Sequence, residues 1–207
     1  MLITGACRGI GRQCAQALAG QGAQLILVDV DDNGLSELGQ ETSAATFRCD
    51  VSAEADVNSF AAKALAAFPV MDLVINAAGG GYERTLGMYR VSRALFPALR
   101  NGRGHNLLVS IPPAEWHAKD AIFPYASSQQ GFQRLCAALA DEARGSPVRV
   151  LIGDPCDGRV RQVLPDRNAG SVADACEFAW RSRAPRGQLA LQIAALVAEF
   201  EPMRRTG

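Results

Sequence analysis

The sequence predicts an α/β fold, a doubly wound parallel sheet of about six strands with helices on both faces. Three observations predict it. Short apolar runs of strand length alternate with segments of helical periodicity along the first three quarters of the chain. A glycine-rich turn joins the first of these runs to the first helix. The length of 207 residues suits one sizeable core, so we expect residues 1–207 to form a single domain.

Six short segments are expected to form strands. Gln24–Val30 is a nearly continuous apolar run, the pattern of a strand that is covered on both faces. Repeated β-α units of this kind imply parallel pairing with right-handed crossovers. The expected strands are Leu2–Ile3, Gln24–Val30, Thr46–Cys49, Asp72–Ile75, Asn106–Ser110 and Val148–Ile152.

The helices are expected from apolar periodicity and from local start and stop signals. Gly20 and Gly22 fit the C-terminal cap of the first helix. Ser52 can cap the second, and Pro69 stops it. The expected helices are Gly11–Ala19, Ala53–Ala67, Leu86–Arg100, Tyr125–Arg144, Ser171–Ser182 and Gln188–Phe200. We expect no seventh strand, and residues 155–207 are expected to form a shortened C-terminal part.

Composition and charge argue against several classes of protein. The 21 basic residues balance the 21 acidic ones, so the charge gives no reason to expect a nucleic-acid partner. No apolar run approaches membrane-spanning length and the first residues do not resemble a signal peptide, so we expect a cytoplasmic protein without membrane contact. The six cysteines are scattered, which predicts neither a disulfide framework nor a metal site.

The strongest local signal is TGACRGIG (Thr4–Gly11), which follows a strand and opens a helix. Its glycines let the backbone turn sharply and approach a pyrophosphate, while the amides and dipole of the helix N-terminus meet the phosphate charge. A glycine turn without a ligand is the alternative, because such motifs also occur by chance. The residues expected to contact a cofactor are Gly5, Cys7, Arg8, Gly9, Ile10 and Gly11.

An acidic residue ends the second expected strand. Asp29 follows Gly11 by eighteen residues, and a carboxylate there can accept hydrogen bonds from both hydroxyls of an adenosine ribose. It would also repel a 2′-phosphate, which favours NAD(H) over NADP(H). Arg8 favours the opposite, because a basic residue beside the turn suits a 2′-phosphate. The direct repulsion by Asp29 is given more weight.

The third and fourth expected strands also end in candidate cofactor contacts. Asp50 and Val51 follow the third strand, where a carboxylate can meet the adenine amine. Small residues follow the fourth strand and let the backbone lie close to a cofactor; the segment is Asn76, Ala77, Ala78 and Gly79.

In this order and spacing, TGACRGIG, Asp29, Cys49-Asp50-Val51 and the NAAG segment resemble the short-chain dehydrogenase/reductase family over roughly residues 1–155. The resemblance implies a Rossmann-type sheet that carries NAD(H) across the carboxyl ends of its strands. It also implies an oxidoreductase that interconverts an alcohol and a carbonyl. A P-loop is excluded, because the GK[ST] sequence is missing.

The same resemblance implies a catalytic tyrosine and a lysine that lowers its pKa. Tyr125 stands at the tyrosine position, but Gln129 replaces the lysine. A free tyrosine has a pKa near 10, and neutral glutamine cannot lower it through charge. Lys63 and Lys119 are the only lysines, and nothing in the spacing requires Lys119 to approach the site. His117 is a further candidate acid or base, with a solvated loop histidine as the alternative.

The serine and asparagine that the resemblance implies are also altered. Pro112 or Pro113 falls at the serine position, and Ser110, just before them, could serve only if the loop shifts. Arg84 stands where the asparagine would be. We hypothesise that Arg84 supplies the missing positive charge to Tyr125; the alternative is a surface arginine that pairs with its neighbours.

The resemblance further implies a homodimer formed by the two long helices, Leu86–Arg100 and Tyr125–Arg144. Both carry apolar stripes, although core packing explains the stripes equally well. The stripe residues are Leu95, Phe96, Leu99, Phe132, Leu135 and Leu139.

Two interpretations of function follow from an intact cofactor half and an altered catalytic half. One is an NAD(H)-dependent oxidoreductase in which Tyr125 is the acid and base, supported by Ser110, Gln129 or Arg84. The other is a catalytically inactive relative that binds NAD(H) as a regulatory or partner subunit. A structural module with a relic site is disfavoured by the complete cofactor motifs. The sequence names no substrate.

Overall fold

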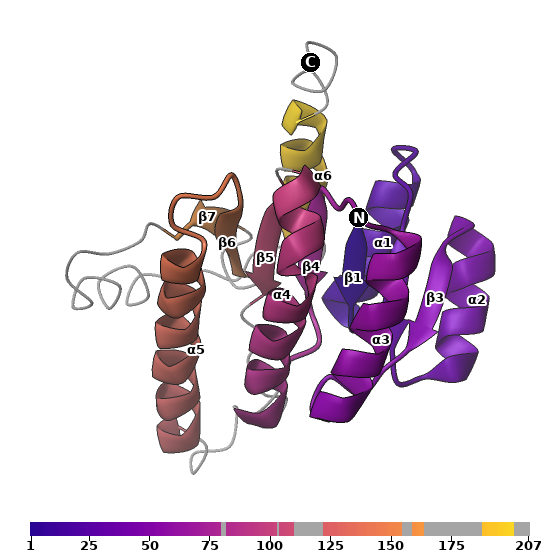
Figure 1. Cartoon of the computed structure of the whole chain (residues 1–207). Helices are drawn as coiled ribbons and strands as arrows, with labels where there is room; N and C mark the ends of the chain where they lie inside the picture. Colours follow the sequence, from indigo (N-terminus) through magenta and orange to yellow (C-terminus); the bar gives the residue numbers. More distant parts are fainter. Residues whose placement is uncertain (80–81, 103, 110–121, 155–158, 164–187, 201–207) are drawn as a thin grey trace.

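A computed structural model describes residues 1–79, 82–102, 104–109, 122–154, 159–163 and 188–200 (Figure 1). Side chains are described for these residues except 82–84, 122–130, 154 and 196–200. The described strands form one seven-stranded sheet in the order β3-β2-β1-β4-β5-β6-β7. The strands are β1 (Leu2–Thr4), β2 (Ile26–Asp29), β3 (Ala45–Arg48), β4 (Leu73–Asn76), β5 (His105–Val109), β6 (Arg149–Asp154) and β7 (Arg159–Gln162).

The first six strands pair in parallel, as the sequence predicts. The connecting helices are α1 (Gly9–Ala19), α2 (Asp32–Thr42), α3 (Glu54–Ala67), α4 (Tyr82–Gly102), α5 (Ile122–Glu142) and α6 (Gln188–Phe200). Each helix expected within the described residues is present, with ends that differ by up to four residues. The expected helix Ser171–Ser182 lies outside the described residues.

Two hydrophobic cores cover the two faces of the sheet. Side chains alternate along a strand, so Leu2 of β1 belongs to one core and Ile3 to the other. The first core packs the strands against α3, α4 and α5, and the second packs them against α1, α2 and α6. This is the doubly wound arrangement that the sequence predicts.

A seventh strand corrects the expected strand count. β7 pairs antiparallel with β6, with Leu151 opposite Gln162 and Asp154 opposite Arg159. The segment reads RVRQ, and of its side chains only Val160 packs against a core. A short edge strand with charged side chains lacks the apolar run that marks a covered strand, so the sequence pattern does not reveal it. After β7, the described part of the chain adds only α6 as a regular element.

The start of α3 also differs from the expectation. The residue that precedes this helix is Ala53, and no side chain caps it among the described residues. Ser52 instead donates its hydroxyl hydrogen to Asp50 Oδ1 at 2.7 Å, and its backbone N–H donates to the same oxygen at 3.0 Å. The prediction that Ser52 caps the helix is therefore wrong, because the helix begins one residue later and Ala53 stands at the N-cap position.

The strand order has a switch of direction next to β1, where the ligand crevice of this type of sheet is expected. The chain leaves β1 toward β2 and β3 on one side, and returns to β4, β5 and β6 on the other. Ligands of open α/β sheets bind outside the carboxyl ends of the strands at such a switch of direction. Within the described residues, no helix is both long and apolar enough to cross a membrane.

Candidate functional site

The carboxyl ends of β1, β2 and β4 meet at this switch point. The Ala77 backbone N–H donates to Thr4 O at 3.2 Å, and the Ala78 N–H donates to the Thr4 hydroxyl oxygen at 3.3 Å. The Ala6 N–H donates to Val28 O at 3.3 Å. These bonds join the glycine-rich turn to the segment after β4 and to β2. These bonds therefore bring together three of the predicted cofactor segments; the fourth, after β3, lies beside the end of β2.

The three glycines of the turn have different physical roles. Gly5 has φ +65°, and a Cβ there would lie 2.8 Å from Ala77 O. A Cβ on Gly11 would lie 2.1 Å from Gly5 O, so the helix packs directly on the turn. Gly9 has φ +52°, yet a Cβ there would meet nothing within 4 Å. The turn is thus closely packed at Gly5 and Gly11 and open at Gly9, as a backbone that receives a pyrophosphate requires.

The N-terminus of α1 lies at the same switch point, because the helix begins within the glycine-rich turn that follows β1. Arg8 is the N-cap residue, and no described side chain caps the first amides of the helix. The first turn of a helix leaves N–H groups without intrahelical partners, and the helix dipole makes this end positive. An anionic group in the crevice would supply the acceptors that the helix end lacks, so the local structure fits the phosphates of a dinucleotide.

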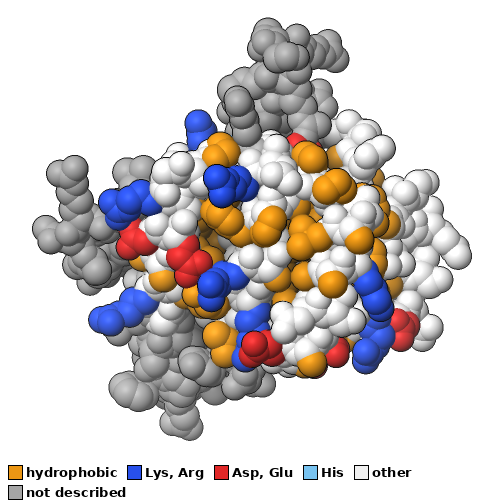
Figure 2. All heavy atoms as spheres, viewed as in Figure 1, with side chains coloured by type: hydrophobic (Ala, Val, Ile, Leu, Met, Phe, Trp, Pro, Cys, Tyr) orange, Lys and Arg blue, Asp and Glu red, His pale blue; other side chains and the backbone are white. Residues whose placement is uncertain are grey.

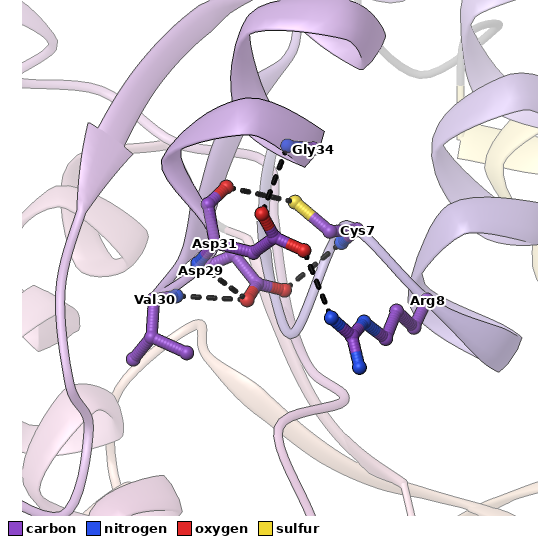
Figure 3. A network of polar contacts seen from close by, with 6 residues as sticks. All are labelled: Cys7, Arg8, Asp29, Val30, Asp31 and Gly34. Carbon is purple, nitrogen blue, oxygen red and sulfur yellow. Dashed lines mark hydrogen bonds and ion pairs between the residues drawn. The ribbon is translucent and has the colours of Figure 1, made fainter.

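Asp29 lies beside the turn at the end of β2 (Figure 3). Its Oδ2 accepts the Cys7 N–H at 2.9 Å, and its Oδ1 accepts the N–H groups of Val30 at 2.8 Å and Asp31 at 3.2 Å. A carboxylate offers about four acceptor positions, so these bonds leave room for about one more donor. For Asp29 to accept both ribose hydroxyls, the longest of these three hydrogen bonds, from the Asp31 N–H, would have to break.

A second carboxylate lies next to Asp29 and was not predicted from the sequence. Asp31 Oδ2 accepts a hydrogen bond from the Arg8 guanidinium at 3.0 Å, and its Oδ1 accepts the Gly34 N–H at 3.1 Å, which caps α2 (Figure 3). The Gly34 bond and then Arg8 lower the pKa of Asp31. The spacing of two residues between the acidic side chains at the end of β2 is the signal that could have revealed it.

Cys7 is buried against these two carboxylates. Its thiol points to Asp31 O at 3.7 Å. Burial, then the charges of Asp29 and Asp31, raise the pKa of the thiol to about 12. Cys7 therefore stays a neutral thiol at physiological pH, and its backbone N–H is already bonded to Asp29.

Asp50 and Val51 follow β3 on the same edge of the sheet. The Cys49 N–H donates to Asp29 O at 2.9 Å, which places the segment beside the end of β2. Val51 is buried, and a Cβ on Gly87 of α4 would lie 2.5 Å from Val51 O. Val51 thus packs under α4, while the Asp50 carboxylate is oriented by Ser52.

The side chain of Asn76 points into the protein. It is fully buried, and its amide donates to Asn106 Oδ1 at 2.9 Å and to the Ser92 hydroxyl oxygen at 3.3 Å. Ser92 in turn donates to Met88 O at 2.6 Å. These bonds tie the end of β4 to β5 and α4. The sequence analysis did not identify Ser92 and Asn106 as partners of Asn76. A polar residue within an otherwise apolar run is the feature that could have indicated them.

The predicted catalytic positions are described only in part. Tyr125 and Gln129 lie four residues apart in α5, which is about one helical turn. Arg84 lies in α4. The side chains of all three are outside the described set, as are Ser110, Pro112, Pro113, His117 and Lys119 entirely. Lys63 is exposed on α3.

Comparisons with known proteins agree with this geometry. The family model for short chain dehydrogenases matches residues 1–157. L-fucose dehydrogenase of Oryctolagus cuniculus is 32% identical over 169 residues, which are 72% of this chain and 59% of that protein. The alignment thus spans less than two thirds of the relative's length.

Solved structures resemble the chain over most of its length. A metagenomic short-chain oxidoreductase in complex with NADP is 25% identical with a TM-score of 0.71, over 95% of this chain and 88% of that one. Hydroxysteroid dehydrogenase from Escherichia coli, at 22% identity and a TM-score of 0.72 over 94% of this chain and 87% of that one, shares the fold. With the glycine-rich turn, Asp29 and the β4 segment assembled at one crevice, the chain belongs to the short-chain dehydrogenase family.

Proposed function

We propose that the chain binds NAD(H), in preference to NADP(H), and interconverts an alcohol and a carbonyl. The observation that carries the proposal is the Asp29 carboxylate, which the Cys7 N–H holds beside the glycine-rich turn at 2.9 Å. A carboxylate at this place accepts ribose hydroxyls and repels a 2′-phosphate. Several similar proteins were solved with NADP or a derivative of it and one with NADH, so the preference is argued from Asp29 and not from family likeness.

The residues present fit the cofactor at each part of the crevice. The open backbone at Gly9 and the N-terminus of α1 would receive the pyrophosphate. Asp29 would accept the adenosine ribose, and Asp50 lies where the adenine amine is expected. The backbone of Ala77, Ala78 and Gly79 would line the path to the nicotinamide. When bound here, the cofactor would donate a hydride as NADH in carbonyl reduction and accept one as NAD+ in alcohol oxidation.

In the active form of this proposal, Tyr125 gives a proton to the carbonyl oxygen or takes one from the alcohol. Each unit by which a tyrosine pKa is lowered requires about 1.4 kcal/mol of favourable interaction with the ionised form. Gln129 is neutral, so a cation has to come from elsewhere, and we propose Arg84. Ser110 and Gln129 would orient the substrate oxygen through hydrogen bonds. The relatives are named as dehydrogenases of a sugar and of a steroid, and the substrate class stays open.

Replacing Arg84 tests this assignment. We expect Arg84→Ala to lower kcat about tenfold, to shift the pH at which activity rises upward, and to leave the Kd for NADH nearly unchanged, with Arg84→Lys retaining most activity. Arg93→Ala is the matched control, because Arg93 lies on the same helix and pairs with Glu142 at 3.3 Å. Unchanged turnover and unchanged NADH binding in Arg84→Ala would refute the role of Arg84.

The second candidate function is a catalytically inactive NAD(H)-binding partner subunit. The neutral Gln129 at the lysine position favours it, as does the exposure of Lys63 on α3. A panel of alcohols and carbonyls assayed with wild type and Tyr125→Phe separates the two. Turnover that Tyr125→Phe abolishes supports the enzyme, whereas intact NADH binding without any turnover supports the partner subunit.

We also propose a homodimer in the cytoplasm, formed through α4 and α5. Hydrophobic side chains gather in the middle of the face that contains α4 (Figure 2). Leu95, Leu99, Phe132 and Leu139 are buried in the core, which leaves only Phe96 and Leu135 of the stripes half-buried. The exposed part of the stripes is therefore small. Light scattering at micromolar concentration tests the assembly, and a monomer contradicts it.

A further inference from the structure

Arg8 is a basic residue beside the carboxylates at the end of β2, where a 2′-phosphate would lie in this type of sheet. It is the N-cap residue of α1, directly before Gly9, and 86% of its side chain is exposed. An arginine close to the end of the second strand can accommodate the 2′-phosphate of NADP(H) in this type of sheet. Taken alone, Arg8 would weaken the discrimination that Asp29 provides.

In the structure the Arg8 guanidinium is already paired with a carboxylate of the protein. Its Nη2 lies 3.0 Å from Asp31 Oδ2, and Figure 3 shows the arginine turned toward this carboxylate. The Asp31 side chain is only 30% exposed, and the Gly34 N–H holds its other oxygen at 3.1 Å. The acceptor for Arg8 is therefore fixed in place before any cofactor arrives, which reduces the entropy lost when the pair forms.

The charges around the turn also disfavour the binding of a 2′-phosphate. Arg8 is one positive charge between two carboxylates, Asp29 and Asp31, so the group as a whole is negative. A 2′-phosphate carries close to two negative charges at neutral pH and would have to displace Asp31 from Arg8. The two hydroxyls of an NAD(H) ribose bring no charge and do not compete for Arg8.

We propose that Asp31 is a cofactor-specificity residue that acts through Arg8, by holding the guanidinium away from a 2′-phosphate. This inference rests on the proposed binding of a nicotinamide dinucleotide at the crevice. It assigns the preference for NAD(H) to two carboxylates with different roles: Asp29 acts directly on the ribose, and Asp31 neutralises Arg8, a basic residue that would favour NADP(H).

The test compares Kd values for NADPH and NADH in a cycle of four proteins: wild type, Asp31→Asn, Arg8→Ala and the double variant. Asparagine is a good N-cap, so Asp31→Asn keeps the bond from Gly34 and removes only the charge. Asp31→Ser is a second variant, whose short side chain caps α2 and does not reach Arg8. Melting temperatures establish that each protein is folded.

The matched control is Glu37→Gln. Glu37 pairs with Arg12 at 3.1 Å, so this change also breaks an ion pair between α1 and α2, but one helical turn away from Arg8. We expect it to leave the ratio of the two Kd values within about twofold of wild type.

For Asp31→Asn and Asp31→Ser we expect NADPH binding to tighten about fivefold, the upper range for releasing an exposed ion pair, with little change for NADH. In the Arg8→Ala background the gain should largely disappear. The gain should also shrink at high salt, because exposed charges are screened. An equal gain without Arg8, or no gain with it, would overturn the proposal.

The same titrations separate this inference from the proposed function. If wild type binds neither nucleotide, the proposed function fails and the inference fails with it. If wild type binds both equally, the proposed preference fails, while the coupling between Asp31 and Arg8 is still measured by the cycle.

Discussion

At the scale of single residues, Asp29 joins the glycine-rich turn to the segment that follows β2 in the candidate cofactor site. Its carboxylate holds the turn through Cys7 and the start of the next segment through Val30 and Asp31. The sequence motif predicts the position of this residue but not these bonds, because backbone partners depend on how the turn folds. The same limit explains why Asp31 was missed: its role depends on Arg8 being close in space.

Replacing Asp29 with asparagine should weaken NADH binding by about tenfold, because hydrogen bonds to a charged acceptor are stronger than those to a neutral one. NADPH binding should stay the same or tighten, since the repulsion is removed. The control is Asp32→Asn, which removes an exposed carboxylate that pairs with Arg48 at 3.4 Å. Fluorescence titration measures both. An equal loss for the two cofactors would contradict the role of Asp29 in specificity.

His105 provides a residue-scale prediction on stability. It is buried in β5, and burial, then Arg149, lowers its pKa to about 4. In the unfolded chain a histidine has a pKa near 6.5, so below that pH the unfolded state binds a proton that the native state does not. The free energy of unfolding is therefore unaffected by His105 above about pH 6.5. It decreases as the pH falls from 6.5 toward 4, by on the order of 2 kcal/mol.

The measurement is the free energy of unfolding by urea between pH 7 and pH 4.5. The wild-type protein should lose stability faster on acidification than His105→Gln, which has no group that titrates at this position. Equal slopes for the two proteins would show that His105 does not set the acid limit.

At the scale of elements, the sequence predicts well those segments whose apolar pattern follows from packing against a core. Strands β1 to β6 and helices α1, α3, α4, α5 and α6 are of this kind, and the turn before α1 was placed by its glycines. Helix α2 was not predicted, because it buries only Leu35 and Leu38 and contains Gly34 and Gly39.

Packing explains both glycines of α2. A Cβ added at Gly34 would lie 2.9 Å from Cys7 Cβ, and one added at Gly39 would lie 2.7 Å from Thr46 Cγ2. Tertiary contacts thus select residues that disfavour a helix locally.

The glycine-rich turn gives an element-scale prediction with an internal control. Gly11→Ala places a Cβ against Gly5 O, so the turn and α1 must separate; we expect a loss of about 2–4 kcal/mol in stability and no measurable NADH binding. In Gly9→Ala the new Cβ meets no atom within 4 Å. We expect a loss of only about 1 kcal/mol in stability, because alanine disfavours the positive φ at this position. Urea unfolding and NADH titration of both variants check this. Equal effects would mean that packing of α1 on the turn does not matter.

At the scale of the whole molecule, the doubly wound sheet follows from the alternation of strands and helices, and the site follows from the sheet. The order β3-β2-β1-β4 brings the ends of these strands to one edge, so residues up to seventy-four positions apart, Thr4 and Ala78, become bonded neighbours. The place where the candidate cofactor segments meet could therefore be predicted from the sequence, and their part in cofactor binding stays a prediction. The catalytic half could not, because the family pattern is altered there and Tyr125, Gln129 and Arg84 have to be judged by geometry that their spacing does not fix.

The most direct test of the central claim is a titration of the purified wild-type protein with NADH, followed by fluorescence, with NADPH measured in parallel. The account predicts saturable NADH binding that is at least about tenfold tighter than NADPH binding. Absence of binding by either nucleotide would mean that the turn is a glycine turn without a ligand. NADPH binding as tight as NADH binding would contradict the role assigned to Asp29.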